Sequence, residues 1–158
     1  MKPIERTGKL RAVIQRVSKA SVTIDQEVYS AIEQGYMVLL GVEVGDVAED
    51  AQYMIDKIAN LRVFTDDNDK MNLSIKDVKG SVLLVSQFTL AGDVRKGRRP
   101  NFMGAERPEK AIPLYERVKE GLEEHGLTVE TGEFGAMMNI ELVNHGPVTI
   151  LLDSHKVF

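Results

Sequence analysis

Two short polar segments carry the groups best suited to chemistry. The first begins where Ser81–Ser86 ends, an apolar run that predicts a buried central strand. It consists of Ser86 and Gln87, followed by Phe88 and Thr89. Open α/β sheets hold their ligands at the ends of such strands. A polar pair can equally cap a strand end, so this segment alone leaves both interpretations open.

The second segment, Asn144–Thr149, contains the dipeptide Gly146-Pro147 between two apolar runs. Such a dipeptide usually forms a turn, and residues 138–144 and 148–153 are accordingly predicted to be two strands joined there. Glycine also removes a side chain, which leaves bare carbonyl groups able to approach a ligand. The segment is therefore a candidate binding element as well as a candidate turn.

Positive charge is concentrated near the first segment, although the chain as a whole is acidic. Twenty Lys and Arg stand against 24 Asp and Glu, for a net charge of −4. This balance argues against a protein that coats nucleic acid. The long loop predicted over residues 91–108 is of a length that is usually functional or disordered in compact domains. This loop contains Arg95, Lys96, Arg98 and Arg99. Four positive charges this close together indicate either a phosphate-binding patch or a solvated basic loop.

Several other kinds of site are excluded or disfavoured by the residue types. The chain has no cysteine, which excludes disulfides, thiolate metal sites and cysteine nucleophiles. Its three histidines lack a partner at ligand spacing. Residues 66–69 predict a turn and fail the calcium-loop pattern, because Asn72 stands at the glycine position. No metal site is expected, and no Gly-x-Ser-x-Gly elbow is present, although a Ser-His-Asp triad without one stays open.

The elements around these segments predict one mixed α/β domain, since 158 residues is the size of a single domain. One helix is expected from a capping box at Asp46–Glu49. A second ends near His125, before Gly126, and Pro113 either delays its start to about Ile112 or kinks it. No apolar run is long enough to span a membrane and no signal peptide is visible, so a soluble cytoplasmic protein is expected. The expected strands cover residues 11–17, 20–24, 27–33, 36–42, 62–65, 81–86 continuing into 87–90, 127–131, 138–144 and 148–153.

Five stretches of the chain match one family pattern in the same order: Arg11–Val17, Ser86–Leu90, Arg99–Phe102, Phe134–Ala136 with Met138, and Asn144–Thr149. Through them the chain resembles the D-aminoacyl-tRNA deacylase family in its standard bacterial form. Five stretches in register are far more specific than any one of them. Leu10 stands where the family usually begins with methionine. Residues 1–10 are therefore predicted to be an N-terminal extension and residues 11–158 a single deacylase domain.

The resemblance implies an enzyme that hydrolyses the ester joining a D-amino acid, or glycine, to the terminal adenosine of tRNA. It implies a three-layer α/β fold of two β-sheets with helices on one side. It also implies a homodimer with active sites at the subunit interface, and neither a metal nor an organic cofactor. An aminoacyl ester is already activated, so the chemistry needs only a positioned water molecule and a stabilised oxyanion.

The resemblance also assigns roles to the candidate residues. The backbone N–H groups of Phe88 and Thr89 are expected to stabilise the oxyanion, while Ser86 and Gln87 shape the pocket and Met138 lines it. A Thr89 nucleophile is the less favoured alternative, since no base is evident beside it. The cationic run at residues 95–99 adds an expectation of its own, that acceptor-stem phosphates contact Arg95, Lys96, Arg98 and Arg99.

For Gly146-Pro147 the resemblance implies a cis peptide bond. Both carbonyl groups are expected to reach across the dimer into the partner's pocket, where they reject L side chains by steric contact. Two other functions stay open. One is a non-catalytic tRNA-binding or ribosome-associated module, which the basic patches alone suggest. The other is an editing domain that removes a wrong L-amino acid, and the intact Gly-Pro pair argues against it.

Overall fold

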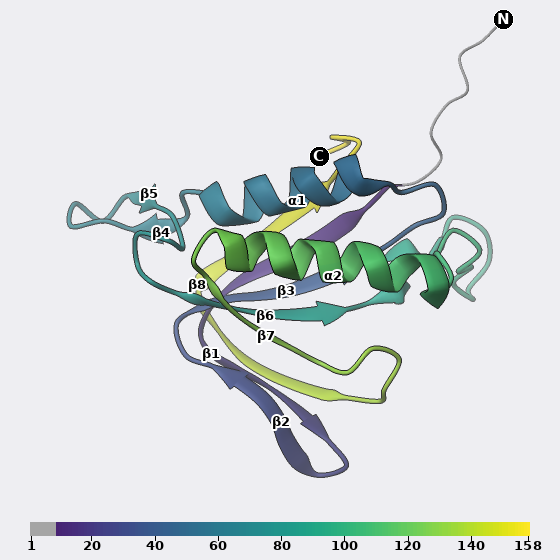
Figure 1. Ribbon diagram of the computed structural model, residues 1–158, viewed down its shortest axis with the longest axis horizontal. Helices are drawn as coiled ribbons and strands as arrows, with labels where there is room; N and C mark the ends of the chain where they lie inside the picture. The colour runs from purple at the N-terminus through teal and green to yellow at the C-terminus, as the bar shows by residue number, and fades with distance from the viewer. Residues whose placement is uncertain (1–8) are drawn as a thin grey trace, which may run out of the picture.

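The computed structural model describes residues 9–158, which form a three-layer α/β structure (Figure 1). Two helices, α1 (Ala48–Asn60) and α2 (Pro108–Glu124), contact each other and lie on one side of a six-stranded sheet. The sheet order is β2-β1-β3-β6-β7, with β8 on the other edge of β1, and β4 and β5 form a second, small sheet. The predicted mixed α/β fold is confirmed. The strands are β1 (Arg11–Ile24), β2 (Glu27–Ile32), β3 (Gly35–Gly41), β4 (Phe64–Thr65), β5 (Met71–Leu73), β6 (Ser81–Ser86), β7 (Thr128–Thr131) and β8 (Asn139–Asp153).

Strand β1 is one long strand, so the prediction of two strands separated by Ser18 and Lys19 is wrong. Its residues 11–17 pair with β3, and residues 20–24 pair with β2. Along its other edge β1 pairs with β8 over nearly its whole length. The exposed polar pair therefore marks the point where β1 exchanges one partner for another, not a turn. This exchange lets β2 and the lower halves of β1 and β8 form a layer of their own (Figure 1).

Two hydrophobic cores separate the three layers. The first lies beneath the helices and contains Ile14, Val38 and Leu84. The second lies between β3–β6 and the lower layer, and contains Met37 and Leu83. Neighbouring residues of β3 and β6 thus enter opposite cores, which is why both strands read as nearly continuous apolar runs. The predicted burial of the 36–42 strand on both faces is confirmed.

Helix α1 begins one residue later than the capping box at Asp46 predicts, with Val47 in place of Asp46 as its N-cap. The carboxylate of Asp50 accepts the N–H of Val47 at 2.8 Å, which caps the first turn from inside the helix. Asp46 instead accepts the N–H of Glu43 at 2.7 Å and so closes the loop that precedes the helix. The predicted cap is wrong because this loop competes with the helix for the Asp46 carboxylate.

Helix α2 begins at Pro108, so of the two predicted alternatives the late start near Ile112 is wrong. A proline is well tolerated in the first turn, where its missing N–H has no partner in the helix. Pro113 lies inside the helix, which continues to Glu124. Gly126 has a φ of +83° and ends the helix as predicted. No helix among residues 9–158 is long and apolar enough to cross a membrane.

Candidate active site

The polar segment after β6 leaves the sheet at Gln87. Its N–H donates to the carbonyl of Leu40 at 2.8 Å, and the chain then forms a short 3-10 helix, η1 (Phe88–Ala91). The predicted continuation of the strand to Leu90 is therefore wrong. The side-chain amide of Gln87 donates to Thr89 Oγ1. Ser86 and Gln87 are half-buried, whereas Phe88 and Thr89 are exposed.

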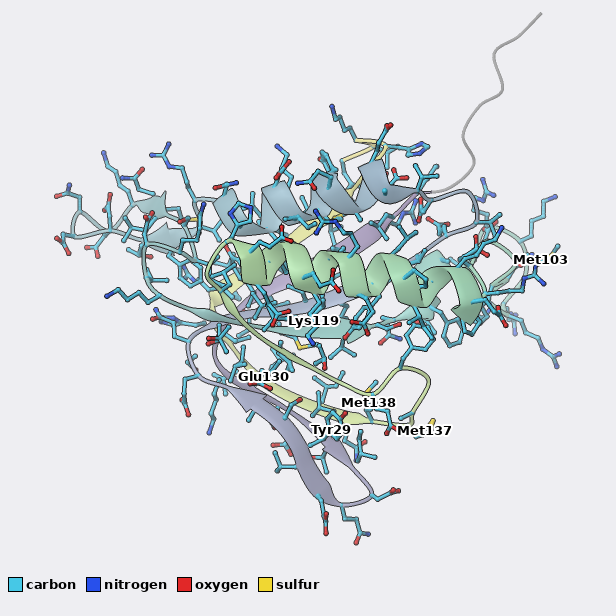
Figure 2. All side chains as sticks on the ribbon, viewed as in Figure 1. Tyr29, Met103, Lys119, Glu130, Met137 and Met138 are labelled. Atoms are coloured by element: carbon cyan, nitrogen blue, oxygen red, sulfur yellow. The ribbon has the colours of Figure 1, made fainter. Side chains whose placement is uncertain are left out.

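A cavity of about 490 Å³ opens at this strand end. The loop between β7 and β8 forms its opposite wall, and Figure 2 places Met137 and Met138 on that loop. A third side is closed by Ala105 and Glu106, which precede α2, and by Pro108, its first residue. Four predicted site residues meet in this cavity, while Thr89, Gly146, Pro147 and the four loop cations do not line it. Its lining residues are Ser86, Gln87, Phe88, Ala105, Glu106, Pro108, Phe134–Met138 and Ile140.

The wall carrying Met138 is positioned by α2 and by a glycine. The hydroxyl of Tyr115 donates to the carbonyl of Leu84 at 2.7 Å, which fixes its ring on β6. Burial raises the pKa of Tyr115, so the hydroxyl stays a donor. The ring packs edge to face against Phe134, with centroids 6.3 Å apart. A Cβ atom at Gly132 would lie 2.6 Å from the sulfur of Met138, so any other residue there would displace the end of the Met138 side chain.

The Gly146-Pro147 segment lies within β8, so the predicted pair of strands joined by a turn is wrong. β8 keeps antiparallel pairing with β1 at Asn144 and again at Thr149, with shifts of register between them. The Gly146–Pro147 peptide bond is cis, as the resemblance implies. The side-chain oxygen of Asn144 accepts the N–H of Val148 at 2.8 Å and braces the bulge. Gly146 and Pro147 are both exposed.

Arg16 supports this bulge through a hydrogen bond to the carbonyl of His145. This residue was not singled out from the sequence. Its side chain is buried, with 7% of the residue exposed. Nε donates to the carbonyl of His145 at 2.7 Å, and Nη1 donates to the carbonyl of Val63 at 2.6 Å. A Cβ atom on Gly146 would lie 2.8 Å from Nη2, so the guanidinium packs directly beneath that glycine. Across residues 9–158 no carboxylate forms an ion pair with Arg16, which makes the backbone carbonyls its main partners.

The four cations of the 91–108 loop occupy an exposed tip. Backbone hydrogen bonds between Asp93 and Asn101, at 2.7 and 2.8 Å, close the loop beneath them. Arg95 forms an ion pair with Asp93 at 2.7 Å, and this guanidinium lowers the pKa of Asp93 to about 2. No ion pair to the other three is found in the described part of the chain. The cationic tip therefore presents three unpaired charges: Lys96, Arg98 and Arg99.

The family assignment rests on a sequence comparison that covers most of the chain. The family model described as "D-Tyr-tRNA(Tyr) deacylase" matches residues 13–153. The chain belongs to this family. That match begins inside β1, runs to the end of β8 and includes all eleven predicted site residues.

Relatives within the family are similar over nearly their whole length. D-aminoacyl-tRNA deacylase of Bacillus pumilus is 59% identical over 147 residues, which is 93% of this chain and all of the relative. The deacylases of Koribacter versatilis and Thermus aquaticus are 58% and 57% identical, covering 94% and 93% of this chain and 100% and 97% of their own.

Solved structures share the deacylase fold. The structure of "c-Myc DNA Unwinding Element Binding Protein" is 42% identical with a TM-score of 0.84, covering 90% of this chain and 97% of its own. A probable eukaryotic D-amino acid tRNA deacylase has a TM-score of 0.79 at 18% identity, covering 92% and 99%, and supports the fold alone.

A second, larger cavity of about 680 Å³ adjoins this one at Ile140, which lines both. It is formed by β1, β2 and β8 and contains Lys19, Glu33 and Glu141. None of the predicted site residues lines it. The smaller cavity is the candidate active site, because it alone joins the strand end of β6 to the matched stretch at Phe134–Met138. Among the described residues no three His, Asp or Glu side chains are grouped to hold a metal ion.

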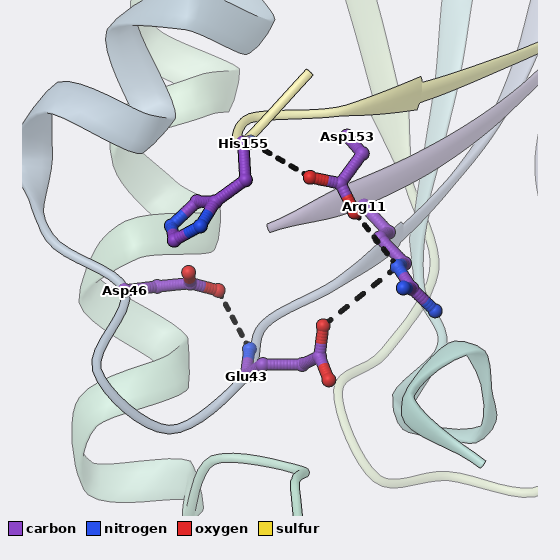
Figure 3. A network of polar contacts seen from close by, with 5 residues as sticks. All are labelled: Arg11, Glu43, Asp46, Asp153 and His155. Atoms are coloured by element: carbon purple, nitrogen blue, oxygen red, sulfur yellow. Dashed lines mark hydrogen bonds and ion pairs between the residues drawn. The ribbon is translucent and has the colours of Figure 1, made fainter. Parts of the chain in front are cut away.

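The third wall of the candidate site rests on a network of charged residues (Figure 3). The strap of residues 104–106 docks on the loop after β3, where Val44 N–H donates to Gly104 O at 2.8 Å. Within that loop Glu43 lies 3.9 Å from Arg11 Nε, which also donates to Asp153 at 3.0 Å. This network thus connects the last residues of β8 to the strap beside the cavity.

This network predicts that the fold loses stability as the pH rises from acidic to neutral. Burial raises the pKa of Asp46 from 3.8 to about 7, and burial also raises the pKa of Glu43. A carboxyl group with a raised folded pKa favours folding while protonated, so stability falls as the pH rises from about 4 through 7. We expect the Tm to fall between pH 5 and pH 8.

Asp46→Asn should reduce that fall in Tm, because an amide oxygen still accepts the Glu43 N–H without carrying charge. One kcal/mol shifts the Tm of a chain of this size by about 2–4 °C, so thermal unfolding at several pH values measures the effect. The matched control is Asp56→Asn, on an exposed face of α1. Equal pH profiles for Asp46→Asn and the unsubstituted chain would contradict the assignment.

Proposed function

We propose that this chain hydrolyses the ester bond of D-aminoacyl-tRNA and releases the D-amino acid and intact tRNA. The observation that carries the proposal is the cavity of about 490 Å³, which Ser86, Gln87, Phe88 and Met138 line in a chain more than half identical to D-aminoacyl-tRNA deacylases. The enzyme domain is placed at residues 11–158 and its activity in the cytoplasm, where tRNA is charged. Catalysis needs neither a metal nor an organic cofactor. The experiment that tests this function is a comparison of D- and L-tyrosyl-tRNA, given at the end of the Discussion.

The reaction needs donors for the oxyanion that forms when water attacks the ester carbonyl. The N–H groups of Phe88 and Thr89 begin η1, and within residues 9–158 no acceptor is recorded for either. Preorganised backbone donors of this kind stabilise developing negative charge without reorganisation during the reaction. A neighbouring ribose hydroxyl of the tRNA takes part in the proton transfers, since no titratable side chain lines the cavity beside the strand end except Glu106.

Thr89 is assigned a backbone role, not a nucleophilic one. Its hydroxyl accepts a hydrogen bond from the amide of Gln87, a group that cannot act as a general base. We expect Thr89→Ala to retain most of the deacylation rate, within about 10-fold, because the N–H survives the substitution. Single-turnover deacylation of D-tyrosyl-tRNA measures this. A trapped acyl-Thr89 ester, or complete loss of turnover with an unchanged Tm, would instead establish a nucleophile.

Selection against L-amino acids is assigned to Gly146 and Pro147 of a second copy of the chain. Both residues are exposed and lie outside the cavity of their own chain, while Arg16 and Asn144 hold their backbone in place. In a homodimer each chain supplies these carbonyls to its partner's pocket. An L side chain then strikes them, a D side chain projects away, and glycine has no side chain to reject. Activity is therefore expected to disappear when the protein is diluted until the dimer dissociates.

The cationic tip is assigned to the phosphates of the acceptor stem. Replacing Arg95, Lys96, Arg98 and Arg99 with alanine is expected to weaken tRNA binding and to flatten its dependence on salt, because each lost phosphate contact removes about 0.7–0.9 from the slope of log K against log salt. Arg95 should contribute least, since Asp93 already pairs with it. Fluorescence anisotropy of labelled tRNA at several salt concentrations measures both effects. Unchanged affinity at low salt would remove the tip from the tRNA-binding surface.

A further inference from the structure

Two aromatic side chains form an exposed pair at the mouth of the candidate active site. Phe88 is 57% exposed and Phe102 is 37% exposed, although both are large apolar residues. Their ring centroids are 5.2 Å apart and the rings are inclined at 72°. Exposed apolar surface beside a binding cavity commonly marks an interaction site.

The pair lies between two features already described, the cavity and the cationic tip. Phe88 begins η1 and lines the cavity. Phe102 packs on the backbone of Gly92, where a Cβ atom would lie 3.0 Å from its ring. It directly follows Asn101, whose two hydrogen bonds to Asp93 close the cationic tip. The pair therefore joins the cavity, which Phe88 lines, to the cationic tip, which Asn101 closes beside Phe102.

The cavity, the aromatic pair and the cationic tip follow one another along the surface, in an order that suits a single-stranded RNA end. In the proposed function the cavity receives the terminal nucleoside with its ester, and the cationic tip attracts phosphates of the stem. Unpaired nucleotides that join these two parts must cross the surface that carries the rings. Aromatic side chains bind unpaired bases by stacking, with little preference for the base.

We propose that Phe102, together with Phe88, forms a stacking platform for the unpaired nucleotides that precede the terminal adenosine of the substrate. The inference rests on the proposed function and adds a base-binding subsite to it. Stacking on one aromatic side chain is worth a factor of roughly 5 to 150 in affinity. The platform therefore lets the enzyme favour a complete RNA end over an aminoacyl nucleoside.

The test compares Phe102→Leu with the unsubstituted chain on two substrates, D-tyrosyl-tRNA and D-tyrosyl-adenosine. Leucine keeps an apolar contact with Gly92 but cannot stack. We expect kcat/KM for the tRNA to fall roughly 5- to 150-fold and kcat/KM for the adenosine ester to stay unchanged. Phe102→Trp should restore the activity on tRNA. The matched control is Val94→Ala, which removes an exposed side chain of the same loop without touching an aromatic ring.

A binding measurement separates this inference from the proposed function, because it needs no hydrolysis. An uncharged acceptor-stem hairpin is titrated with and without its unpaired 3′ nucleotides. Phe102→Leu should weaken the binding of only the hairpin that keeps its unpaired 3′ nucleotides. The loss of affinity should be the same factor at every salt concentration. Loss of the tip cations should instead change the dependence of affinity on salt. Three results would contradict the proposed stacking platform. They are an equal loss of affinity for both hairpins, an equal loss of kcat/KM on both ester substrates, and a changed oligomeric state. The last result would show that a second copy of the chain covers the rings. Failure of the unsubstituted chain to hydrolyse either ester would contradict only the proposed function.

Discussion

Replacing Arg16 with glutamine is expected to destabilise the chain and to weaken its discrimination against L-aminoacyl esters. The guanidinium donates to the carbonyls of His145 and Val63, which lie far apart in the sequence. A hydrogen bond to a charged group contributes about 1.5–3 kcal/mol, and its loss leaves a buried carbonyl without a partner. We expect the free energy of unfolding to fall by about 3 kcal/mol.

The functional part of this prediction concerns the bulge at Gly146-Pro147. Without its anchor at His145 the bulge can shift, so the ratio of D- to L-tyrosyl-tRNA deacylation should fall at least 10-fold. Chemical denaturation and the two deacylation rates measure these effects on the same protein. Arg62→Gln is the matched control, since Arg62 donates to exposed backbone elsewhere. An unchanged D/L ratio in a destabilised Arg16→Gln variant would show that Arg16 supports the fold only.

Filling the cavity is expected to have the largest effect on the rate. Ala136 lines the cavity on the wall opposite Ser86. A tryptophan in its place occupies the space of the substrate's aminoacyl end, and misplacement of about 1 Å at a reacting centre already costs roughly 100-fold. We expect Ala136→Trp to lower kcat/KM for D-tyrosyl-tRNA at least 100-fold with little change in Tm.

The matched control for this variant is Glu133→Trp. Glu133 belongs to the same loop, where its carbonyl accepts the N–H of Ala136 at 3.1 Å, but its side chain is exposed and does not line the cavity. It should keep nearly full activity. Equal activity of the two tryptophan variants would move the active site away from this cavity.

Local sequence patterns predicted the elements well where one physical signal dominated. The apolar runs of β3 and β6 and the inner faces of both helices follow directly from burial. Predictions failed where a tertiary partner decided between two local options. The Ser18-Lys19 pair and the Gly146-Pro147 pair were both interpreted as breaks between strands. Each strand instead continues past its pair, because the pairing between β1 and β8 resumes on the far side after a shift of register.

The candidate site was predictable on one side only. Ser86 and Gln87 stand out as polar residues at a strand end, whereas Ala105 and Pro108 have ordinary side chains that enter the site through the fold of the loop. Arg16 did carry a signal. It follows Ala12 and Ile14 at alternate positions of β1, on the inward face, and an arginine there predicts a buried charge with specific partners.

The central claim is that this chain hydrolyses D-aminoacyl-tRNA and spares the L form. The most direct measurement is the deacylation of matched D- and L-tyrosyl-tRNA by the unsubstituted chain, with Ala136→Trp as the inactive reference. We predict rapid release of D-tyrosine and no release of L-tyrosine above that reference. Hydrolysis of both forms at similar rates, or of the L form alone, would contradict chiral selection, and hydrolysis of neither would contradict the enzyme assignment itself.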